Sequence, residues 1–317
     1  MKKVLVTTKL LKSNEERISQ LWDAKLNLNN EIYSENKLIE LSKDCDGILS
    51  SIVDKIDKKT INKLSDKVKI ISNFAVGFGN IDIEAASKRN IVVTNTPDVL
   101  TDATAEIAML LILGASRRAV EGMQWARNKN WRWSADFLIG KQLSGSKLGI
   151  LGMGRIGRAV AKRAKAFGME IHYHNRSKLN QDLEAGATYH DNIQSLFSTS
   201  DILSINCIVT KETKKIINKK TLKFFSKEAI ITNSARGDMI DDDAMVEALK
   251  DKRIFALGLD VYNGEPNIHP GYLEHHNVFI LPHIGSATKK TRIDMADLAI
   301  NNVEEFFKSG KCINKVN

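Results

Sequence analysis

A glycine-rich hexapeptide at residues 152–157 has the G-x-G-x-x-G spacing of a turn that binds dinucleotides. A short apolar run at 148–151 precedes it, and apolar residues at helical spacing follow it up to a second apolar run at 170–174. In such a strand–turn–helix–strand unit the first glycine permits a tight turn, the second lets the backbone approach a pyrophosphate, and the third lets helix and strand pack closely. The residues expected at the cofactor are therefore Gly152, Gly154, Arg155, Ile156 and Gly157.

The end of the second strand indicates which dinucleotide binds. A chain that selects NAD places an acid there to bind the ribose hydroxyls, and this acid repels a 2′-phosphate. This chain has Asn175, Arg176 and Ser177 instead, and an arginine can bind phosphate through two hydrogen bonds. We therefore expect NADPH to be preferred over NADH, with a solvated basic turn as the alternative.

Polar residues also follow three later apolar runs, in segments 233–238, 259–266 and 281–288. If each run is a strand of one parallel sheet, all three segments lie at its carboxyl edge, where open α/β folds bind ligands. They contain an arginine, an acid and a histidine, which makes them a plausible active site.

Taken in order, these motifs resemble those of the D-isomer-specific 2-hydroxyacid dehydrogenases. The likeness covers essentially the whole chain and rests on Ala-Arg-Gly at 235–237, Asp-Val-Tyr-Asn-Gly-Glu-Pro at 260–266 and Pro-His-Ile-Gly-Ser-Ala-Thr at 282–288. Within the family, His-Asn-Arg-Ser at 174–177 and Trp-Arg-Trp at 131–133 look most like glyoxylate/hydroxypyruvate reductases.

The resemblance implies hydride transfer between a nicotinamide and a small 2-keto or 2-hydroxy acid. Arg236 would bind the substrate carboxylate and polarise the ketone, and His283 would act as the general acid/base. Glu265 would hydrogen-bond His283 and stabilise its imidazolium form.

Other roles come from the same resemblance. The backbone of Val76 and Gly77 would hold the substrate carboxylate, and Ser51 would line the opposite wall. The residues expected near the cofactor are Cys207, Ser234, Asp260 and Gly285, although Asp260 could simply cap its strand end. A homodimer is expected, and Trp131 and Trp133 would either line the substrate entrance or pack between subunits. The alternatives are a D-3-phosphoglycerate or D-lactate type dehydrogenase, and a dinucleotide-sensing corepressor without activity.

Alternating strands and helices predict an α/β fold of two doubly wound parallel-sheet domains, a Rossmann nucleotide-binding domain inserted in a flavodoxin-like substrate domain. We expect the substrate domain over 1–98 and 288–317, and the dinucleotide-binding domain over 99–287. Asp82 is expected to cap a helix over 83–87, and 101–127 is expected to form one long helix. Strands are expected at 4–7, 47–50, 70–73, 91–94, 148–151, 170–174, 202–207, 229–233, 255–261 and 278–281, and a last helix at 289–308.

Composition narrows the class of protein. The 317 residues contain no apolar run long enough for a membrane span, and three scattered cysteines favour a reducing cytoplasm. A net charge of +9 raises the possibility of nucleic-acid binding, but the cations are scattered and form no basic stripe, so we expect none. No metal is expected either, because His275-His276 lacks companion ligands and Asp241–Asp243 suits the start of a helix.

Overall fold

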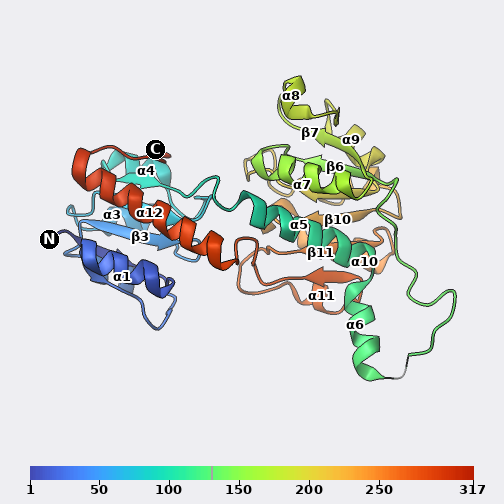
Figure 1. Ribbon diagram of the computed structural model, residues 1–317, viewed down its shortest axis with the longest axis horizontal. Helices are drawn as coiled ribbons and strands as arrows, with labels where there is room; N and C mark the ends of the chain where they lie inside the picture. Colours follow the sequence, from blue (N-terminus) through green and yellow to red (C-terminus); the bar gives the residue numbers. More distant parts are fainter. Residues whose placement is uncertain (130) are drawn as a thin grey trace. The chain divides into compact units, whose positions relative to one another are not determined.

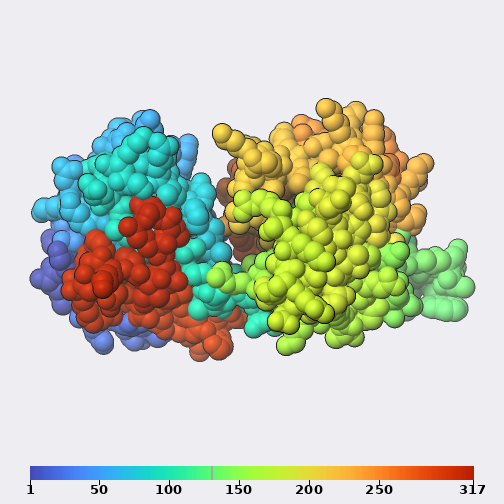
Figure 2. Space-filling model, turned by 90° about the horizontal axis from the view of Figure 1, so that it is seen from above, coloured from blue at the N-terminus to red at the C-terminus, as the bar shows by residue number. Residues whose placement is uncertain are grey.

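The computed structural model describes residues 1–129 and 131–317, which fold into two compact units. Unit 1 consists of residues 1–100 and 286–317, and unit 2 consists of residues 101–285. The two ends of the chain therefore belong to one unit. In Figure 2 the C-terminal segment, in red, lies against the blue and cyan surface formed by the first hundred residues.

Unit 1 is a five-stranded parallel sheet in the order β2-β1-β3-β4-β5, with helices on both faces (Figure 1). Its strands are β1 (Lys3–Val6), β2 (Asp23–Lys25), β3 (Gly47–Ser51), β4 (Ile70–Phe74) and β5 (Val92–Thr94). Its helices are α1 (Lys12–Leu21), α2 (Glu35–Ser42), α3 (Lys58–Lys63), α4 (Ile83–Lys88) and α12 (Lys289–Ser309). Successive residues of β4 face opposite layers: Ser72 donates to the carbonyl of Ala299 in α12, at 3.0 Å, and Ile71 packs among residues of α2, α3 and α4.

Unit 2 is a seven-stranded parallel sheet in the order β12-β11-β10-β9-β6-β7-β8. Its strands are β6 (Lys147–Leu151), β7 (Glu170–His174), β8 (Thr188–Tyr189), β9 (Ile202–Ile205), β10 (Ile230–Asn233), β11 (Ala256–Leu259) and β12 (Val278–Ile280). Its α-helices are α5 (Thr101–Ser116), α6 (Ala119–Asn128), α7 (Arg155–Ala166), α8 (Gln181–Glu184), α9 (Ile193–Thr199), α10 (Asp242–Lys250) and α11 (Pro270–Leu273), with short 3-10 turns η1 (Thr221–Phe224) and η2 (Gly237–Met239). The strand order reverses at β6, which makes the loop after β6 a switch point where such sheets bind ligands.

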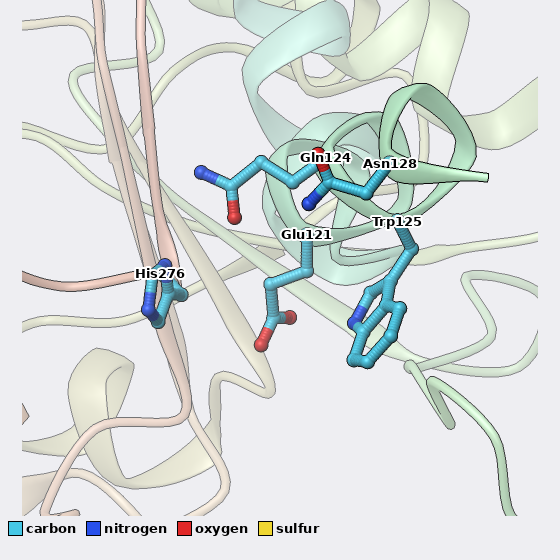
Figure 3. A pocket seen from close by; sticks show the side chains of 5 residues that line it. All are labelled: Glu121, Gln124, Trp125, Asn128 and His276. Atoms are coloured by element: carbon cyan, nitrogen blue, oxygen red, sulfur yellow. The ribbon is translucent and has the colours of Figure 1, made fainter. Parts of the chain in front are cut away.

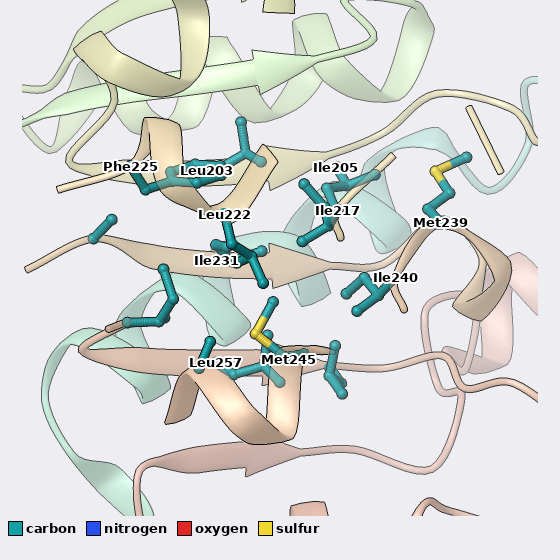
Figure 4. Packing of buried hydrophobic residues seen from close by; sticks show 14 of the residues in the cluster. Leu203, Ile205, Ile217, Leu222, Phe225, Ile231, Met239, Ile240, Met245 and Leu257 are labelled. Atoms are coloured by element: carbon teal, nitrogen blue, oxygen red, sulfur yellow. The ribbon is translucent and has the colours of Figure 1, made fainter. Parts of the chain in front are cut away.

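Two buried apolar layers hold the sheet of unit 2 to its helices. Ile230 faces the layer shared with α5 and α7, and Ile231 faces the layer shared with α9 and α10. Figure 4 shows Ile231 and Leu257 packed against Leu222, from η1, and Met245, from α10. Because both faces of the strands are covered, the strands read as continuous apolar runs in the sequence.

The structure confirms the predicted fold class and the N-cap at Asp82, whose side chain accepts from the N–H of Ala85. The single long helix over 101–127 is wrong: α5 ends at Ser116 and α6 begins at Ala119. Arg118 lies between them in the left-handed region, with φ of 53°, and its guanidinium pairs with Glu121. Apolar spacing does not reveal such a break, because no glycine or proline marks it.

Strands β2 and β8 were not predicted either, since both are very short edge strands. Among the described residues, no helix is long and apolar enough to cross a bilayer.

Candidate active site

The glycine loop of unit 2 joins β6 to α7 at the point where the strand order reverses. Gly152 has φ of +95°, and a Cβ on it would lie 2.6 Å from Cys207. A Cβ on Gly157 would lie 2.3 Å from the carbonyl oxygen of Gly152. Gly154 differs, because its φ of −76° suits any residue and an added Cβ would meet no described atom within 4 Å. Close packing within the chain explains why positions 152 and 157 are glycine. No such contact explains the glycine at 154, and the open space beside it fits a bound phosphate group.

The first turn of α7 presents free backbone donors beside that open space. Among the hydrogen bonds of the described residues, none uses the N–H of Ile156 or Gly157. The first N–H groups of a helix have no partner inside the helix, and the helix dipole favours an anion near them. Residues 152–157 therefore fit the pyrophosphate of a dinucleotide.

The end of β7 lies next to the glycine loop. The side-chain carbonyl of Asn175 accepts from the N–H of Met153, at 2.7 Å, and so ties the two segments together. Arg176 and Ser177 are exposed, and Lys178 lies 3.8 Å from Glu184. The loop thus presents an amide, a guanidinium and a hydroxyl, all of which can donate hydrogen bonds to a phosphate.

Cys207 forms the wall under the glycine loop. Its Sγ lies 3.6 Å from Sδ of Met239, and burial raises the pKa of Cys207 to about 11. The thiol is therefore neutral near pH 7 and acts as a small apolar side chain, not as a nucleophile. Ser234 follows β10 and is half-buried.

Arg236 lies on the loop after β10, and the last residue of that strand holds this loop in place. Asn233 donates from Nδ2 to the carbonyl of Arg236, at 2.8 Å, and accepts at Oδ1 from the N–H of Ala235, at 2.9 Å. Gly237 lets the loop approach its neighbour, since a Cβ there would lie 2.0 Å from the carbonyl carbon of Tyr262. Burial lowers the pKa of Arg236, and Glu265 and Asp238 oppose that shift. The guanidinium stays charged at any physiological pH.

Glu265 and His283 form a hydrogen-bonded pair, with Oε2 of the acid 2.6 Å from Nδ1 of the imidazole. The other carboxylate oxygen of Glu265 accepts from the N–H of Tyr262, at 2.9 Å. Burial pushes the pKa of Glu265 upward, but the hydrogen bond and charge of His283, the N–H of Tyr262 and the charge of Arg236 together hold this pKa below its usual value. Because Nδ1 faces the carboxylate, Nε2 is the ring nitrogen that can exchange a proton with a ligand.

Asp260 anchors the loop that carries His283. Its side chain is 1% exposed and accepts from the N–H groups of Ile284 and Gly285, each at 2.8 Å. His283, directly before them, has φ of 54°, a left-handed conformation that few residues other than glycine adopt. The two hydrogen bonds hold the backbone in place immediately after this strained residue.

Arg236, Glu265 and His283 thus follow β10, β11 and β12, which are neighbours in the sheet of unit 2. Their loops are linked by the contact of Gly237 with Tyr262 and by the pair of Glu265 with His283. A fixed cation beside a carboxylate–imidazole pair can bind a carboxylate and exchange a proton with an adjacent oxygen.

The remaining candidates lie in unit 1. Ser51 ends β3 and donates from its N–H to the buried carboxylate of Asp54, at 2.7 Å. Val76 and Gly77 follow β4, and within the described part of the chain their N–H groups donate to no acceptor. Two neighbouring free N–H groups can bind an anion such as a carboxylate.

Sequence reasoning missed the residues that hold these loops. Asn233 at the end of β10 and Asn73 near the end of β4 are fully buried, and each binds backbone groups of the loop that follows it. Tyr262 donates from its hydroxyl to the carbonyl of Leu281, at 2.6 Å, and so joins the loops after β11 and β12. An asparagine near the carboxyl end of an apolar strand is the signal that could have identified the first two.

A cavity of about 280 Å³ lies elsewhere in unit 2, between α6 and the loop before β12 (Figure 3). Its lining residues are Glu121, Gln124, Trp125, Asn128 and His276, and none of them belongs to the candidate site. Among the described residues no group of three or more histidine, cysteine or acidic side chains could hold a metal ion. Asp242 instead accepts hydrogen bonds from Asn263 and Tyr272, both at 2.7 Å.

Residues 109–285 match the family model of the D-isomer specific 2-hydroxyacid dehydrogenase, NAD binding domain. The chain is 40% identical to the glycerate dehydrogenase of Hyphomicrobium methylovorum over 96% of both chains. It is also 40% identical to the glyoxylate reductase of Thermococcus litoralis, over 99% of this chain and 96% of that one. The NADPH-dependent glyoxylate/hydroxypyruvate reductase of Sinorhizobium meliloti, solved in complex with NADP and malonate, is 32% identical, has a TM-score of 0.89, and is matched over 99% of this chain and 96% of that one.

The chain belongs to the D-isomer-specific 2-hydroxyacid dehydrogenase family. It is a D-2-hydroxyacid dehydrogenase that binds a pyridine nucleotide, as the sequence predicted.

Replacing Glu265 by Gln tests the pairing with His283 in this dehydrogenase. The contact with His283 lowers the pKa of Glu265, so the stabilisation that the pair provides is present above the usual glutamate pKa and lost as pH falls through the lowered value. We expect kcat/KM for reduction to be about tenfold to a hundredfold lower in Glu265→Gln across about pH 5 to 9, because the wild-type carboxylate is charged throughout that range.

The measurement is a pH–rate profile from pH 5 to 9 for wild type and Glu265→Gln. Asp238→Asn is the matched control, because Asp238 also lies near Arg236 but is exposed and makes no contact with His283. Identical profiles for wild type and Glu265→Gln would contradict the pairing.

Proposed function

We propose that this dehydrogenase reduces a small 2-keto acid, glyoxylate or hydroxypyruvate, to the D-2-hydroxy acid. The observation that carries the proposal is the hydrogen-bonded pair of Glu265 and His283, on loops adjacent to that of Arg236. The names of relatives that match nearly the whole chain, glyoxylate reductase and glycerate dehydrogenase, support the substrate class.

Each residue would have a distinct task. Arg236 would hold the substrate carboxylate and polarise the ketone. His283 would donate the proton on Nε2 to the carbonyl oxygen, and Glu265 would stabilise the imidazolium before that transfer. Ser51 and the N–H groups of Val76 and Gly77 would bind the substrate from unit 1.

The nucleotide would be held by unit 2, the expected dinucleotide-binding domain over 99–287, and the substrate domain would be 1–98 and 288–317. A bound nicotinamide would supply the hydride. The backbone after Gly152 would bind the pyrophosphate, and the residues near the nicotinamide end would be Cys207, Ser234, Asp260 and Gly285. Asp260 keeps further lone pairs for this task, because each carboxylate oxygen can accept more than one hydrogen bond.

The activity is tested by following NADPH and NADH oxidation with glyoxylate, hydroxypyruvate, pyruvate and phosphohydroxypyruvate. We expect turnover with the first two, a loss of about 10²- to 10⁴-fold in kcat for His283→Gln, and a large rise in the KM of the keto acid for Arg236→Lys. Arg253→Lys is the control, because Arg253 is a half-buried arginine of unit 2 whose hydrogen bonds, within the described residues, go to backbone carbonyls.

Other outcomes would identify the rival functions. Preference for phosphohydroxypyruvate or pyruvate would indicate a D-3-phosphoglycerate or D-lactate type dehydrogenase. Tight nucleotide binding without turnover of any keto acid would contradict the proposed activity and favour a dinucleotide-sensing corepressor.

We further propose that NADPH is preferred over NADH. Asn175 lies where a carboxylate would repel the 2′-phosphate, and its side-chain carbonyl already accepts from Met153. Arg176 and Ser177 are exposed beside it and free to bind that phosphate. The NADP complex of the Sinorhizobium relative is in line with this proposal.

Arg176→Ala should raise the KM for NADPH about tenfold to a hundredfold and leave the KM for NADH within about twofold, because only NADPH carries the 2′-phosphate. Asn175→Asp should act in the same direction, since it keeps the acceptor for Met153 and adds a negative charge. Lys178→Ala is the control, as Lys178 is already close to Glu184. An unchanged ratio of the two KM values would contradict the role of Arg176.

We propose that the enzyme is a homodimer formed through α6 and the segment that follows it. No residue of α6 is buried in the single chain, and Figure 1 shows this helix projecting from the sheet of unit 2. Trp125 meets Phe137 edge-on and Trp131 stacks on it, with ring centroids 5.8 and 6.5 Å from that of Phe137, yet both tryptophans are about half exposed. Exposed aromatic clusters of this kind are typical of protein interfaces.

Light scattering should give twice the 35.4 kDa chain mass for wild type. Trp125→Glu and Trp131→Glu should shift the enzyme toward monomer, because each would bury a charge in the interface. Ile32→Glu is the control, since Ile32 is an exposed apolar residue of unit 1. A monomeric wild-type enzyme would contradict the proposal.

A further inference from the structure

In the loop after β4, three successive backbone carbonyl groups accept hydrogen bonds from other parts of unit 1. The carbonyl of Ala75 accepts from the N–H of Thr96, at 2.9 Å. The carbonyl of Val76 accepts from Nδ2 of Asn95, at 2.7 Å, and that of Gly77 accepts from Nδ2 of Asn73, at 3.0 Å. Three successive peptide groups are therefore fixed in orientation.

Fixing a carbonyl also fixes the N–H on the other side of the same peptide bond. In a trans peptide the two groups point in opposite directions, and these bonds are trans. The three bound carbonyls thus turn the N–H groups of Val76, Gly77 and Phe78 away from the donors that bind the carbonyls. Within the described residues none of these three N–H groups has an acceptor.

The two asparagines are themselves held firmly. Asn73 is fully buried, its Oδ1 accepts from the hydroxyl of Ser50, at 3.0 Å, and its amide also reaches Asn80. Asn95 is 9% exposed, and its backbone is fixed: its N–H donates to the carbonyl of Asn314, and its backbone carbonyl accepts from the fully buried Asn302 of α12. The amide of Asn73 has partners at both ends and cannot easily rotate, and the side chain of Asn95 extends from a fixed backbone, so both hold their loop carbonyls in place.

We propose that Asn95 and Asn73 are positioning residues that hold the N–H groups of Gly77 and Phe78, which join the N–H of Val76 in a preformed receptor for the carboxylate of the 2-keto acid. The inference rests on the proposed function and deepens it. The asparagines touch no substrate; they act by keeping the donors aimed at the anion before it binds. Preformed donors lose little entropy when they bind, which favours tight binding of a small anion.

Removing either asparagine should weaken carboxylate binding selectively. For Asn95→Ala and Asn73→Ala we expect the KM for glyoxylate to rise about tenfold, the loss of one hydrogen bond to a charged group, with little change in the KM for NADPH. The inhibition constant of oxalate, a dicarboxylate that cannot be reduced, should rise by the same factor. Asn95→Leu keeps the side-chain volume without the donor and should behave like Asn95→Ala.

Asn14→Ala is the matched control. Asn14 is an equally buried asparagine of unit 1, but it binds Asp297 of α12 and not the loop after β4. It should lower the melting temperature about as much as the test variants and leave both KM values unchanged. A rise in the KM for glyoxylate that appears equally in Asn14→Ala would reduce the effect to general destabilisation and overturn the inference.

A second measurement detects anion binding to this loop without depending on catalytic turnover. In amide NMR spectra of the full chain, oxalate should shift the signals of Val76, Gly77 and Phe78 in wild type and not in the asparagine variants. Unshifted signals in wild type, or unchanged KM and inhibition constants in folded variants, would overturn the inference. A wild type that shows these shifts but reduces no 2-keto acid would contradict the proposed function and leave the anion receptor standing.

Discussion

The geometry of the catalytic loops depends on one buried carboxylate, that of Asp260. Burial raises the pKa of Asp260, so ionising it costs free energy that its two backbone hydrogen bonds from Ile284 and Gly285 offset in part. Those bonds hold the backbone directly after His283, whose left-handed conformation would otherwise relax. With the backbone fixed, Nδ1 of the imidazole meets Glu265 at 2.6 Å, which leaves Nε2 as the nitrogen for a ligand.

The same principle organises the other loops: a buried polar side chain at or near the end of a parallel strand holds a loop at that edge of the sheet. Asn233 of β10 and Asn73 of β4 each hold the loop that follows their own strand, whereas Asp260, directly after β11, holds the loop after the neighbouring strand β12. Each satisfies backbone groups that a loop cannot pair within a sheet. The sheet therefore provides the position of each loop, and one polar side chain provides its conformation.

Much of this could be predicted from the sequence, because parallel strands covered on both faces appear as apolar runs. The runs ending near Asn233, Leu259 and Ile280 located the three catalytic loops, and the glycine spacing located the nucleotide turn. The holding contacts could not be predicted, since Asn95 binds Val76 and Tyr262 binds Leu281 across 19 residues of chain each. The break at Arg118 was also hidden, because an ion pair with Glu121 accompanies a conformation that glycine usually marks.

Asn175 shows how structural and ligand requirements can be separated at one position. Its Oδ1 joins the end of β7 to the glycine loop through the N–H of Met153, and a carboxylate oxygen would accept that bond equally well. The fold therefore requires an acceptor at this position but not an amide. The amide differs from a carboxylate in being uncharged, and the hydrogen bond to Met153 does not require an uncharged acceptor. A neutral group followed by an exposed arginine suits an anionic ligand, so the departure from an acid is best explained by the nucleotide and supports the proposed preference for NADPH.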